Sequence, residues 1–214
     1  MTDNFENYRE FINICGGLPD NNDKGTLDKY YTIELIRRGK DNPELPGANY
    51  HFKNYYIFSW HDYEKYKQEI KDVCTLLKLR AYCSVNYKSI SQVALDTLAE
   101  SAQRVAVHDF KKFYNIFESC SGKYVGKGNQ LWIVDIDNAN DWKVNKIAEY
   151  VNTMQSGFIR NVVYVMPTKS GVHLITHPFN LQQFEEGFDK HIMSLGIEHP
   201  DIKKNHITLL YENL

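Results

Sequence analysis

The segment Leu131-Trp132-Ile133-Val134-Asp135-Ile136-Asp137 decides the fold, because its apolar run is typical of a buried strand and its end is acidic. The sequence after it alternates between the apolar period of a helix and that of a strand. The predicted elements are a helix, two strands joined by a Gly-containing turn, a second helix and a closing strand: 141–154, 161–167, 172–179, 181–195 and 206–212.

That order, β-α-β-β-α-β, predicts the α+β fold class and a sheet of the ferredoxin-like or RNA-recognition-motif-like type. Short connections and right-handed crossovers place 131–137 beside 172–179 at the centre of such a sheet. The closing strand, 206–212, is then expected on the other side of 131–137.

The sequence before this unit predicts further strands and helices. Residues 55–85 have the pattern of an additional β-α-β unit, and two helices are expected after it, over 90–104 and 108–119.

The N-terminal part is predicted to be helical. Apolar residues recur at helical spacing over 3–15 and 27–38, with Gly- and Pro-containing breaks after each stretch. We therefore divide the chain into a helical N-terminal extension, 1–54, and an α+β domain, 55–214.

The composition excludes several classes of protein. The 214 residues carry a net charge of −2, which argues against a broad nucleic-acid coat while leaving a local basic groove open. No run approaches the ~20 apolar residues of a membrane span, and the polar start is unlike a signal peptide. The four scattered cysteines read as reduced thiols, so we expect a cytoplasmic protein that does not contact a membrane.

Asp135 and Asp137 are the first candidate site residues. Side chains alternate along a strand, so both carboxylates point to one face and Ile136 to the other. Two like charges this close favour neutralisation by a divalent cation, Mg²⁺ or Mn²⁺. The alternative is structural: Asp137 begins a turn that leads to a capped helix at Asp141.

The hairpin that contains Lys169, Ser170 and His173 is the second candidate. His173 can contact a phosphate, and the ammonium of Lys169 and the hydroxyl of Ser170 can assist at the Gly turn. The alternative is a half-exposed strand histidine beside a solvated turn.

Further candidates lie on other segments. Asp201, just before the closing strand, is a third possible carboxylate ligand, or else a residue of a Pro-Asp turn. Arg80 and Lys204 are candidate nucleotide-binding cations, or else ordinary surface charges. The Gly-rich loop offers three more residues that could meet phosphate, or else form an ordinary solvated loop: Lys123, Tyr124 and Lys127.

The ordered set of motifs resembles the archaeo-eukaryotic primase superfamily. WIVDID, then TKSGVHLI, then a later Asp segment match that family's D-x-D strand, small-x-His hairpin and hydrophobic-Asp motif on a palm. The resemblance covers about 130–212 and implies metal binding by Asp135 and Asp137 and a contact of His173 with the phosphates of the incoming nucleotide. Asp201 is a poor match to the third motif, and the family's zinc-binding module is missing from the sequence.

Three functions follow as hypotheses. The first is a metal-dependent, primase-like nucleotidyltransferase in DNA replication, with nucleic acid and nucleoside triphosphates as partners. Some segments also resemble small bacteriophage proteins, which implies a phage-encoded member in the host cytoplasm. The second is a non-catalytic module that binds nucleic acid, a replication helicase or another replisome protein. The third is a two-histidine phosphoesterase, since His206-Ile207-Thr208 gives one H-x-T motif; His173 lacks a hydroxyl two residues later. A structural or capsid-associated protein is also left open.

Overall fold

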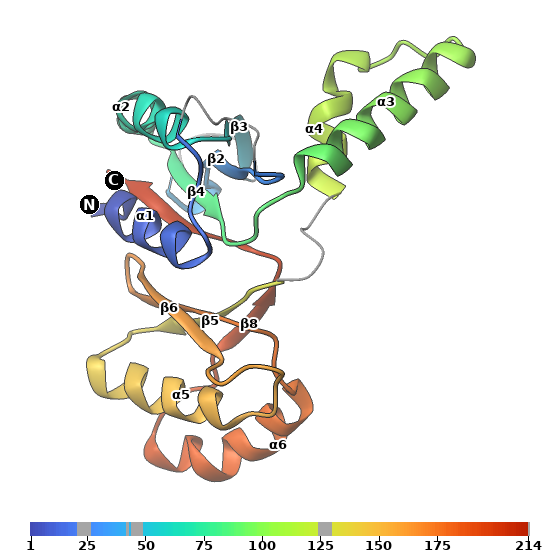
Figure 1. Cartoon of the computed structure of the whole chain (residues 1–214). Helices are drawn as coiled ribbons and strands as arrows, with labels where there is room; N and C mark the ends of the chain where they lie inside the picture. The colour runs from blue at the N-terminus through green and yellow to red at the C-terminus, as the bar shows by residue number, and fades with distance from the viewer. Residues whose placement is uncertain (21–26, 42, 44–48, 124–129, 214) are drawn as a thin grey trace.

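The computed structural model describes residues 1–20, 27–41, 43, 49–123 and 130–213, and places them in two antiparallel sheets with six α-helices (Figure 1). The α+β class is therefore confirmed. The first sheet has the order β1-β9-β4-β2-β3, and the second has the order β6-β7-β5-β8.

The first sheet is assembled from distant parts of the chain. Its strands are β1 (Thr2–Asp3), β2 (Tyr31–Arg37), β3 (Tyr50–Ile57), β4 (Arg80–Ser84) and β9 (Ile207–Glu212). The helices that accompany them are α1 (Phe5–Ile14) and α2 (Trp60–Leu77), and the short 3-10 helix η2 (Gly39–Asp41) follows β2.

The second sheet comes from one continuous part of the chain. Its elements in order are β5 (Trp132–Asp137), α5 (Asp141–Thr153), β6 (Val162–Pro167), β7 (Gly171–Thr176), α6 (Leu181–His191), η4 (Met193–Leu195) and β8 (Asp201–Lys204). Helices α5 and α6 cover the face of this sheet that is turned away from the first sheet (Figure 1). The predicted placement of 131–137 beside 172–179 at the centre is confirmed, because β5 pairs with β7.

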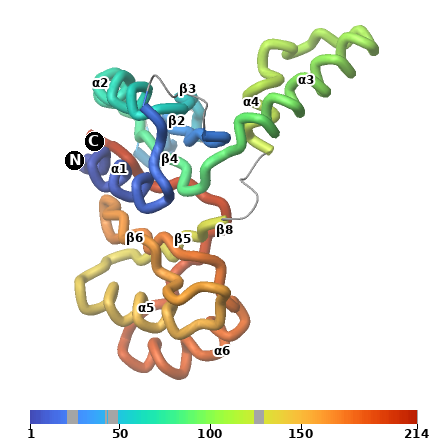
Figure 2. Tube along the Cα trace, in the orientation of Figure 1, coloured from blue at the N-terminus to red at the C-terminus, as the bar shows by residue number. Residues whose placement is uncertain are grey.

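A helical arm projects from the body. It consists of α3 (Ile90–Ala106), η3 (Phe113–Asn115) and α4 (Ile116–Lys123), and it extends beyond both sheets (Figures 1 and 2). The helix predicted over 90–104 is confirmed, but the one predicted over 108–119 begins later, at Ile116. His108 and Lys112 have positive φ angles, which interrupt a helix in this segment.

Two sequence predictions are wrong, one about a helix and one about the place of a strand. Residues 27–38 are not helical, because Tyr31, Ile33 and Leu35 point into the core from a strand that pairs with β3 and β4. The closing strand, β9, is a strand as predicted but lies in the first sheet. The neighbour of β5 is instead β8, a four-residue strand.

The N-terminal segment is therefore part of the first sheet. Helix α1 confirms the helix predicted over 3–15, whereas β1, β2 and the start of β3 replace the rest of the expected helical extension. The division predicted between residues 54 and 55 falls inside β3.

The core continues from one sheet to the other. Phe5, Tyr8 and Phe11 of α1 pack in one cluster with Ile33 of the first sheet and Ile133 of the second. Asn4 links the sheets by hydrogen bonds, because its Nδ2 donates to the carbonyls of Pro167, at 2.6 Å, and Leu209, at 2.9 Å. Within the described ranges, none of the helices has the length and apolar character needed to cross a bilayer.

Candidate functional site between the two sheets

One row of side chains crosses the second sheet at its polar end. Strand register pairs Met166 with His173, His173 with Asp135, and Asp135 with Asp201. Directly paired residues share a face, so all four side chains lie on the face turned toward the first sheet. The sheet topology thus brings Asp135, His173 and Asp201 together although they are far apart in the sequence.

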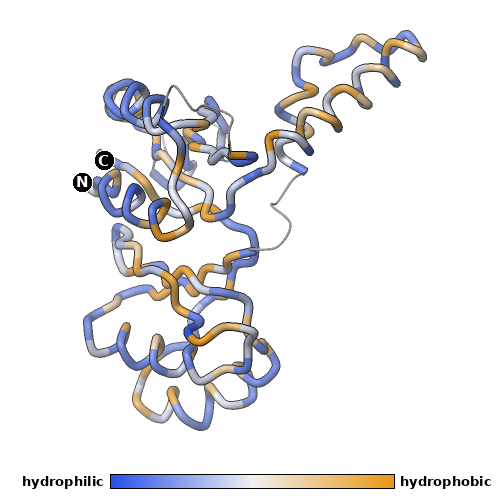
Figure 3. The backbone as a smooth tube through the Cα atoms, viewed as in Figure 1, coloured by the Kyte–Doolittle hydropathy of each residue, from blue (hydrophilic) through white to orange (hydrophobic). Residues whose placement is uncertain are grey.

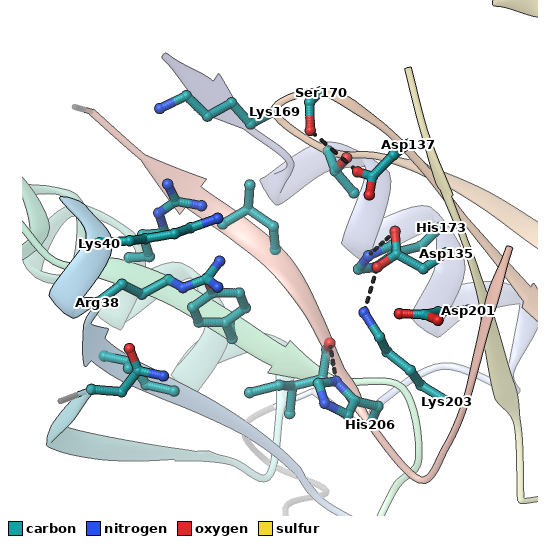
Figure 4. A pocket seen from close by; sticks show the side chains of 17 residues that line it. Arg38, Lys40, Asp135, Asp137, Lys169, Ser170, His173, Asp201, Lys203 and His206 are labelled. Carbon is teal, nitrogen blue, oxygen red and sulfur yellow. Dashed lines mark hydrogen bonds and ion pairs between the residues drawn. The ribbon is translucent and has the colours of Figure 1, made fainter. Parts of the chain in front are cut away.

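Both carboxylate oxygens of Asp135 have partners. Oδ1 lies 3.2 Å from Nε2 of His173, and Oδ2 accepts a short hydrogen bond from Nζ of Lys203 (Figure 4). The hydrogen bond with His173 and that with Lys203 hold the pKa of Asp135 well below its usual range, although burial opposes them. The carboxylate is therefore ionised and held in a fixed orientation.

The imidazole of His173 is held from two sides. Its Nδ1 lies 2.8 Å from Oγ1 of Thr208, a buried residue on β9 of the first sheet. Its Nε2 faces Asp135, so both ring nitrogens have protein partners. The sequence predicts a phosphate contact for His173, but in this structure the ring orients Asp135 and links the two sheets.

The turn before β7 brings Ser170 to Asp137. Oγ of Ser170 is 3.5 Å from Oδ1 of Asp137, and the Asn138 amide donates to the Ser170 carbonyl at 2.8 Å. Gly171 makes this approach possible. A Cβ at Gly171 would lie 1.9 Å from the Ile136 carbonyl oxygen, so no side chain fits between β7 and β5 there.

The opposite wall of the site comes from the first sheet and is cationic. Arg38 and Lys40 follow β2, and Arg80 and Tyr82 lie on β4. Nη1 of Arg38 lies 3.4 Å from the hydroxyl oxygen of Tyr82. Figure 4 shows Arg38 and Lys40 across the pocket from the labelled acidic residues.

A buried ion-pair group supports this wall. Arg80 pairs with Asp41 at 2.7 Å and with Glu212 at 3.0 Å, and Lys169 approaches Glu212 at 3.6 Å. The side chain of Glu212 is fully buried, and its carboxylate lies against these two cations. Lys169 is half exposed and, like Arg80, lines the pocket.

Together the two walls enclose a pocket of about 570 Å³. That volume lies in the range of small-molecule sites, roughly 300–1,000 Å³. Its acidic and cationic walls belong to different sheets. The predicted residues that line it are Arg80, Asp135, Asp137, Lys169, Ser170, His173 and Asp201.

Not every predicted residue lies in the pocket. Lys204 is on the opposite face of β8, where its Nζ sits 4.8 Å from the ring centroid of Trp132. Lys123 ends α4 and is absent from the described lining, and Tyr124 and Lys127 fall outside the described residues.

The structure adds residues that the sequence does not single out as site residues. Arg38 and Lys40 fall in a segment read as helix and loop, and Lys203 and Thr208 lack a motif of their own. The alternation of Asp201 and Lys203 along one strand was the sequence signal that could have placed Lys203 on the same face as Asp201. His206, considered only for the phosphoesterase motif, also lines the pocket.

The acidic wall has the chemistry of a divalent-cation site. Asp135, Asp137 and Asp201 supply the oxygen donors that Mg²⁺ and Mn²⁺ prefer. Within the described part of the chain, however, no three His, Cys, Asp or Glu side chains are gathered closely enough to hold a metal. The ammonium of Lys203 occupies the position beside Asp135 that a cation would take. The residue types therefore suit a divalent cation, but their described arrangement does not form a site for one while Lys203 is paired with Asp135.

Fold and site together define an α+β protein with a polar pocket between two antiparallel sheets. No protein-family model, curated protein or solved structure matches the chain.

Proposed function

We propose that the protein is a metal-dependent nucleotidyltransferase of primase-like type, acting on nucleic acid and nucleoside triphosphates. One observation carries this proposal: a single pocket has three carboxylates on one wall and Arg38, Lys40 and Lys169 near the other. A nucleoside triphosphate needs cations for its phosphates, and phosphoryl transfer needs carboxylates that hold a metal ion.

The architecture of the second half supports the same proposal. We infer that the unit from β5 to β8 is a palm of the ferredoxin-like or RNA-recognition-motif-like type. Its element order is β-α-β-β-α-β, and β5 and β7 occupy the centre of its sheet. The acidic pair then lies at the end of a central strand.

The cationic side would bind the triphosphate. Arg38 and Lys40 lie on the first sheet's wall, and Lys169 lies at the hairpin turn, so phosphate oxygens between them could accept several charge-assisted hydrogen bonds. The ring of Tyr82 on the same wall offers an apolar face for a base or sugar.

The acidic side would hold the divalent cation. Asp135, Asp137 and Asp201 are the proposed ligands, and the bound ion would polarise the phosphate and neutralise the leaving pyrophosphate. In the reaction, a 3′-hydroxyl oxygen bonds to the α-phosphorus as the bond to pyrophosphate breaks, and the hydroxyl proton leaves to solvent. His173 is a positioning residue in this scheme because it orients Asp135.

Nucleotide incorporation tests the proposal. Purified protein should extend a primer, or synthesise one, on single-stranded templates with labelled nucleotides and Mg²⁺ or Mn²⁺. Asp135→Asn and Asp137→Asn should each reduce incorporation by at least about 100-fold. The matched control is Asp141→Asn, which changes an exposed acidic residue on α5 that does not line the described pocket. Full activity in both pocket variants would overturn the proposal.

Lys203 gives a second test of the acidic wall. If its ammonium competes with a cation for Asp135, Lys203→Met should tighten Mn²⁺ binding measured by calorimetry. Asp137→Asn should weaken it. Unchanged Mn²⁺ binding in both variants would show that this wall holds no cation.

A non-catalytic binding module on the same fold is the second candidate. It is favoured by one observation: both oxygens of Asp135 and both ring nitrogens of His173 are already satisfied by protein atoms. In that case the protein would bind single-stranded nucleic acid or a replisome protein, and Asp135→Asn would leave binding unchanged. Binding without any transfer on all templates would select this candidate.

A further inference from the structure

The tip of the helical arm carries a surface that the pocket does not explain. The arm is anchored at its base, where Tyr30, Val93, Ile116 and Cys120 form a small core of their own. There the hydroxyl of Tyr30 donates to Oγ of Ser121 at 2.9 Å. Beyond this base, α3 and α4 project away from both sheets (Figures 1 and 2).

The tip is a built turn. Arg104 organises it: its Nε pairs with Glu100 at 2.9 Å, and its Nη1 donates to the Lys111 carbonyl at 2.7 Å. The carboxylate of Asp109 accepts from the Lys111 amide at 3.1 Å. His108 and Lys112 adopt φ angles of 55° and 53°, which cost roughly 1 kcal/mol or more each for residues with a Cβ.

This turn presents aromatic rings to solvent. Phe110 is 61% exposed and Tyr114 is 85% exposed, and Phe113 lies beside Phe110 with ring centroids 6.4 Å apart. Several exposed rings gathered on one turn form an apolar patch, which is the kind of surface that marks an interaction site. Figure 3 shows apolar residues along the projecting arm.

The charge that accompanies the rings is positive. Lys111 and Lys112 stand between Phe110 and Phe113 in the sequence, and neither forms an ion pair with any described residue. The nearby acidic residues have partners within the turn, since Glu100 pairs with Arg104, and the half-exposed Asp109 accepts from the turn's own backbone. The rings therefore lie beside two ammonium groups, while these carboxylates are engaged within the arm.

Rings interleaved with cations are the chemistry that recognises single-stranded nucleic acid. Unpaired bases stack on aromatic faces, and lysines contact the phosphates between them. A duplex hides its base faces in its own stack, so it offers nothing to these rings. We propose that the arm tip, Phe110 to Tyr114, is a binding surface for single-stranded DNA or RNA, separate from the pocket between the sheets.

Equilibrium binding tests the inference without any catalytic step. The probe is a fluorescent single-stranded oligonucleotide, oligo(dT) or oligo(U), titrated with full-length protein in EDTA and without nucleotides, with anisotropy as the readout. Phe110→Ala/Tyr114→Ala should weaken binding about 10-fold or more. Lys111→Gln/Lys112→Gln should weaken it and lower the slope of log K against log salt by about 1.4.

A matched control is Trp142→Ala/Lys146→Gln, which removes one exposed ring and one lysine from α5 in the other half of the molecule. It should bind like wild type. Because binding is measured in EDTA and without nucleotides, a failure of the catalytic proposal leaves this inference standing, and the reverse also holds.

Two results would overturn the inference: wild-type affinity in both tip variants, or equal affinity of the wild type for duplex and single strand. The exposed Leu95 and Leu98 on α3 raise the alternative of a protein partner or a second copy. Analytical sedimentation tests this alternative. A change of oligomeric state in the tip variants, with oligonucleotide binding intact, would assign the tip to protein contacts and overturn the inference. Circular dichroism and thermal unfolding establish that each variant is folded.

Discussion

Asp135 on β5 and His173 on β7 are direct register partners, and the carboxylate Oδ1 lies 3.2 Å from the imidazole Nε2. The pairing of the two strands thus places these side chains next to each other, so the contact follows from the backbone register. Thr208 holds the other ring nitrogen from the first sheet. Asp135 is therefore both part of the proposed site and part of the contact between the sheets.

The first prediction concerns the stability that Asp135 contributes. Because its pKa is lowered in the folded state by His173 and Lys203, its ionised form stabilises the fold above the unfolded carboxyl pKa, about 4. That contribution is lost as the pH falls through the lower folded pKa. Asp135→Asn should reduce the free energy of unfolding by roughly 1.5–3 kcal/mol at pH 7, measured by urea denaturation.

The same variant should differ less from wild type at pH 3 than at pH 7. Asp137→Asn is the control, because its carboxylate is exposed and its contact with Ser170 is long, at 3.5 Å, so its effect should stay within about 0.5 kcal/mol. An Asp135→Asn effect that is constant from pH 7 to pH 3 would contradict this account.

The second prediction concerns the close approach at Gly171. A methyl group there would collide with the Ile136 carbonyl and push β7 away from β5. Gly171→Ala should therefore destabilise the protein by about 1–3 kcal/mol. Gly157→Ala, where nothing lies within 4 Å of the added Cβ, should change stability by less than about 0.5 kcal/mol. Similar urea midpoints for the two variants would refute the steric explanation.

The third prediction concerns the buried charge of Glu212. Glu212→Ala leaves Arg80 buried beside Asp41 alone and should cost about 3–5 kcal/mol. Glu149→Ala removes the carboxylate of an exposed pair with Lys146 and should cost less than about 1 kcal/mol.

A volume-conserving variant separates charge from packing. Glu212→Gln removes the charge and keeps the side-chain volume, so it should cost nearly as much as Glu212→Ala in chemical denaturation. A Glu212→Gln variant as stable as wild type would show that packing and not charge governs this position.

Much of the second sheet could be predicted from the sequence because its information is local. The apolar run of β5 ending at Asp135 and Asp137 shows both the strand and the shared face of the carboxylates. The order of elements also predicts that β5 and β7 are adjacent in the sheet, because few topologies obey the rules for short, right-handed connections.

The first sheet could not be predicted in the same way. The apolar spacing of residues 27–38 also suits a helix, and only pairing with β3 and β4 selects the strand. Arg38 and Lys40 follow β2. Because this segment was predicted to be helical, the sequence did not place them on a wall of the pocket. Lys203 and Thr208 were missed because β8 and β9 join different sheets on either side of a two-residue connection.

The last prediction concerns the thiols. Burial raises the pKa of Cys15 to about 11 and that of Cys74 to about 12, so both are protonated in the folded protein at pH 8. Iodoacetamide should modify these two slowly at pH 8 in the native protein and rapidly in urea, as measured by mass spectrometry of digested peptides.

The raised pKa values also set a dependence of stability on pH. A thiol whose folded pKa is raised stabilises the fold fully below its unfolded pKa, about 8.5, and loses that contribution as the pH rises toward the folded value. Cys74 alone should account for about 2 kcal/mol lost between pH 8 and pH 10. Cys74→Ala should therefore show a smaller loss over this interval than wild type, whatever its stability at pH 8. An identical loss of stability in both proteins would mean that the Cys74 thiol does not titrate with unfolding. In the alkylation experiment, rapid modification of Cys74 in the native protein would show that helix α2 opens locally.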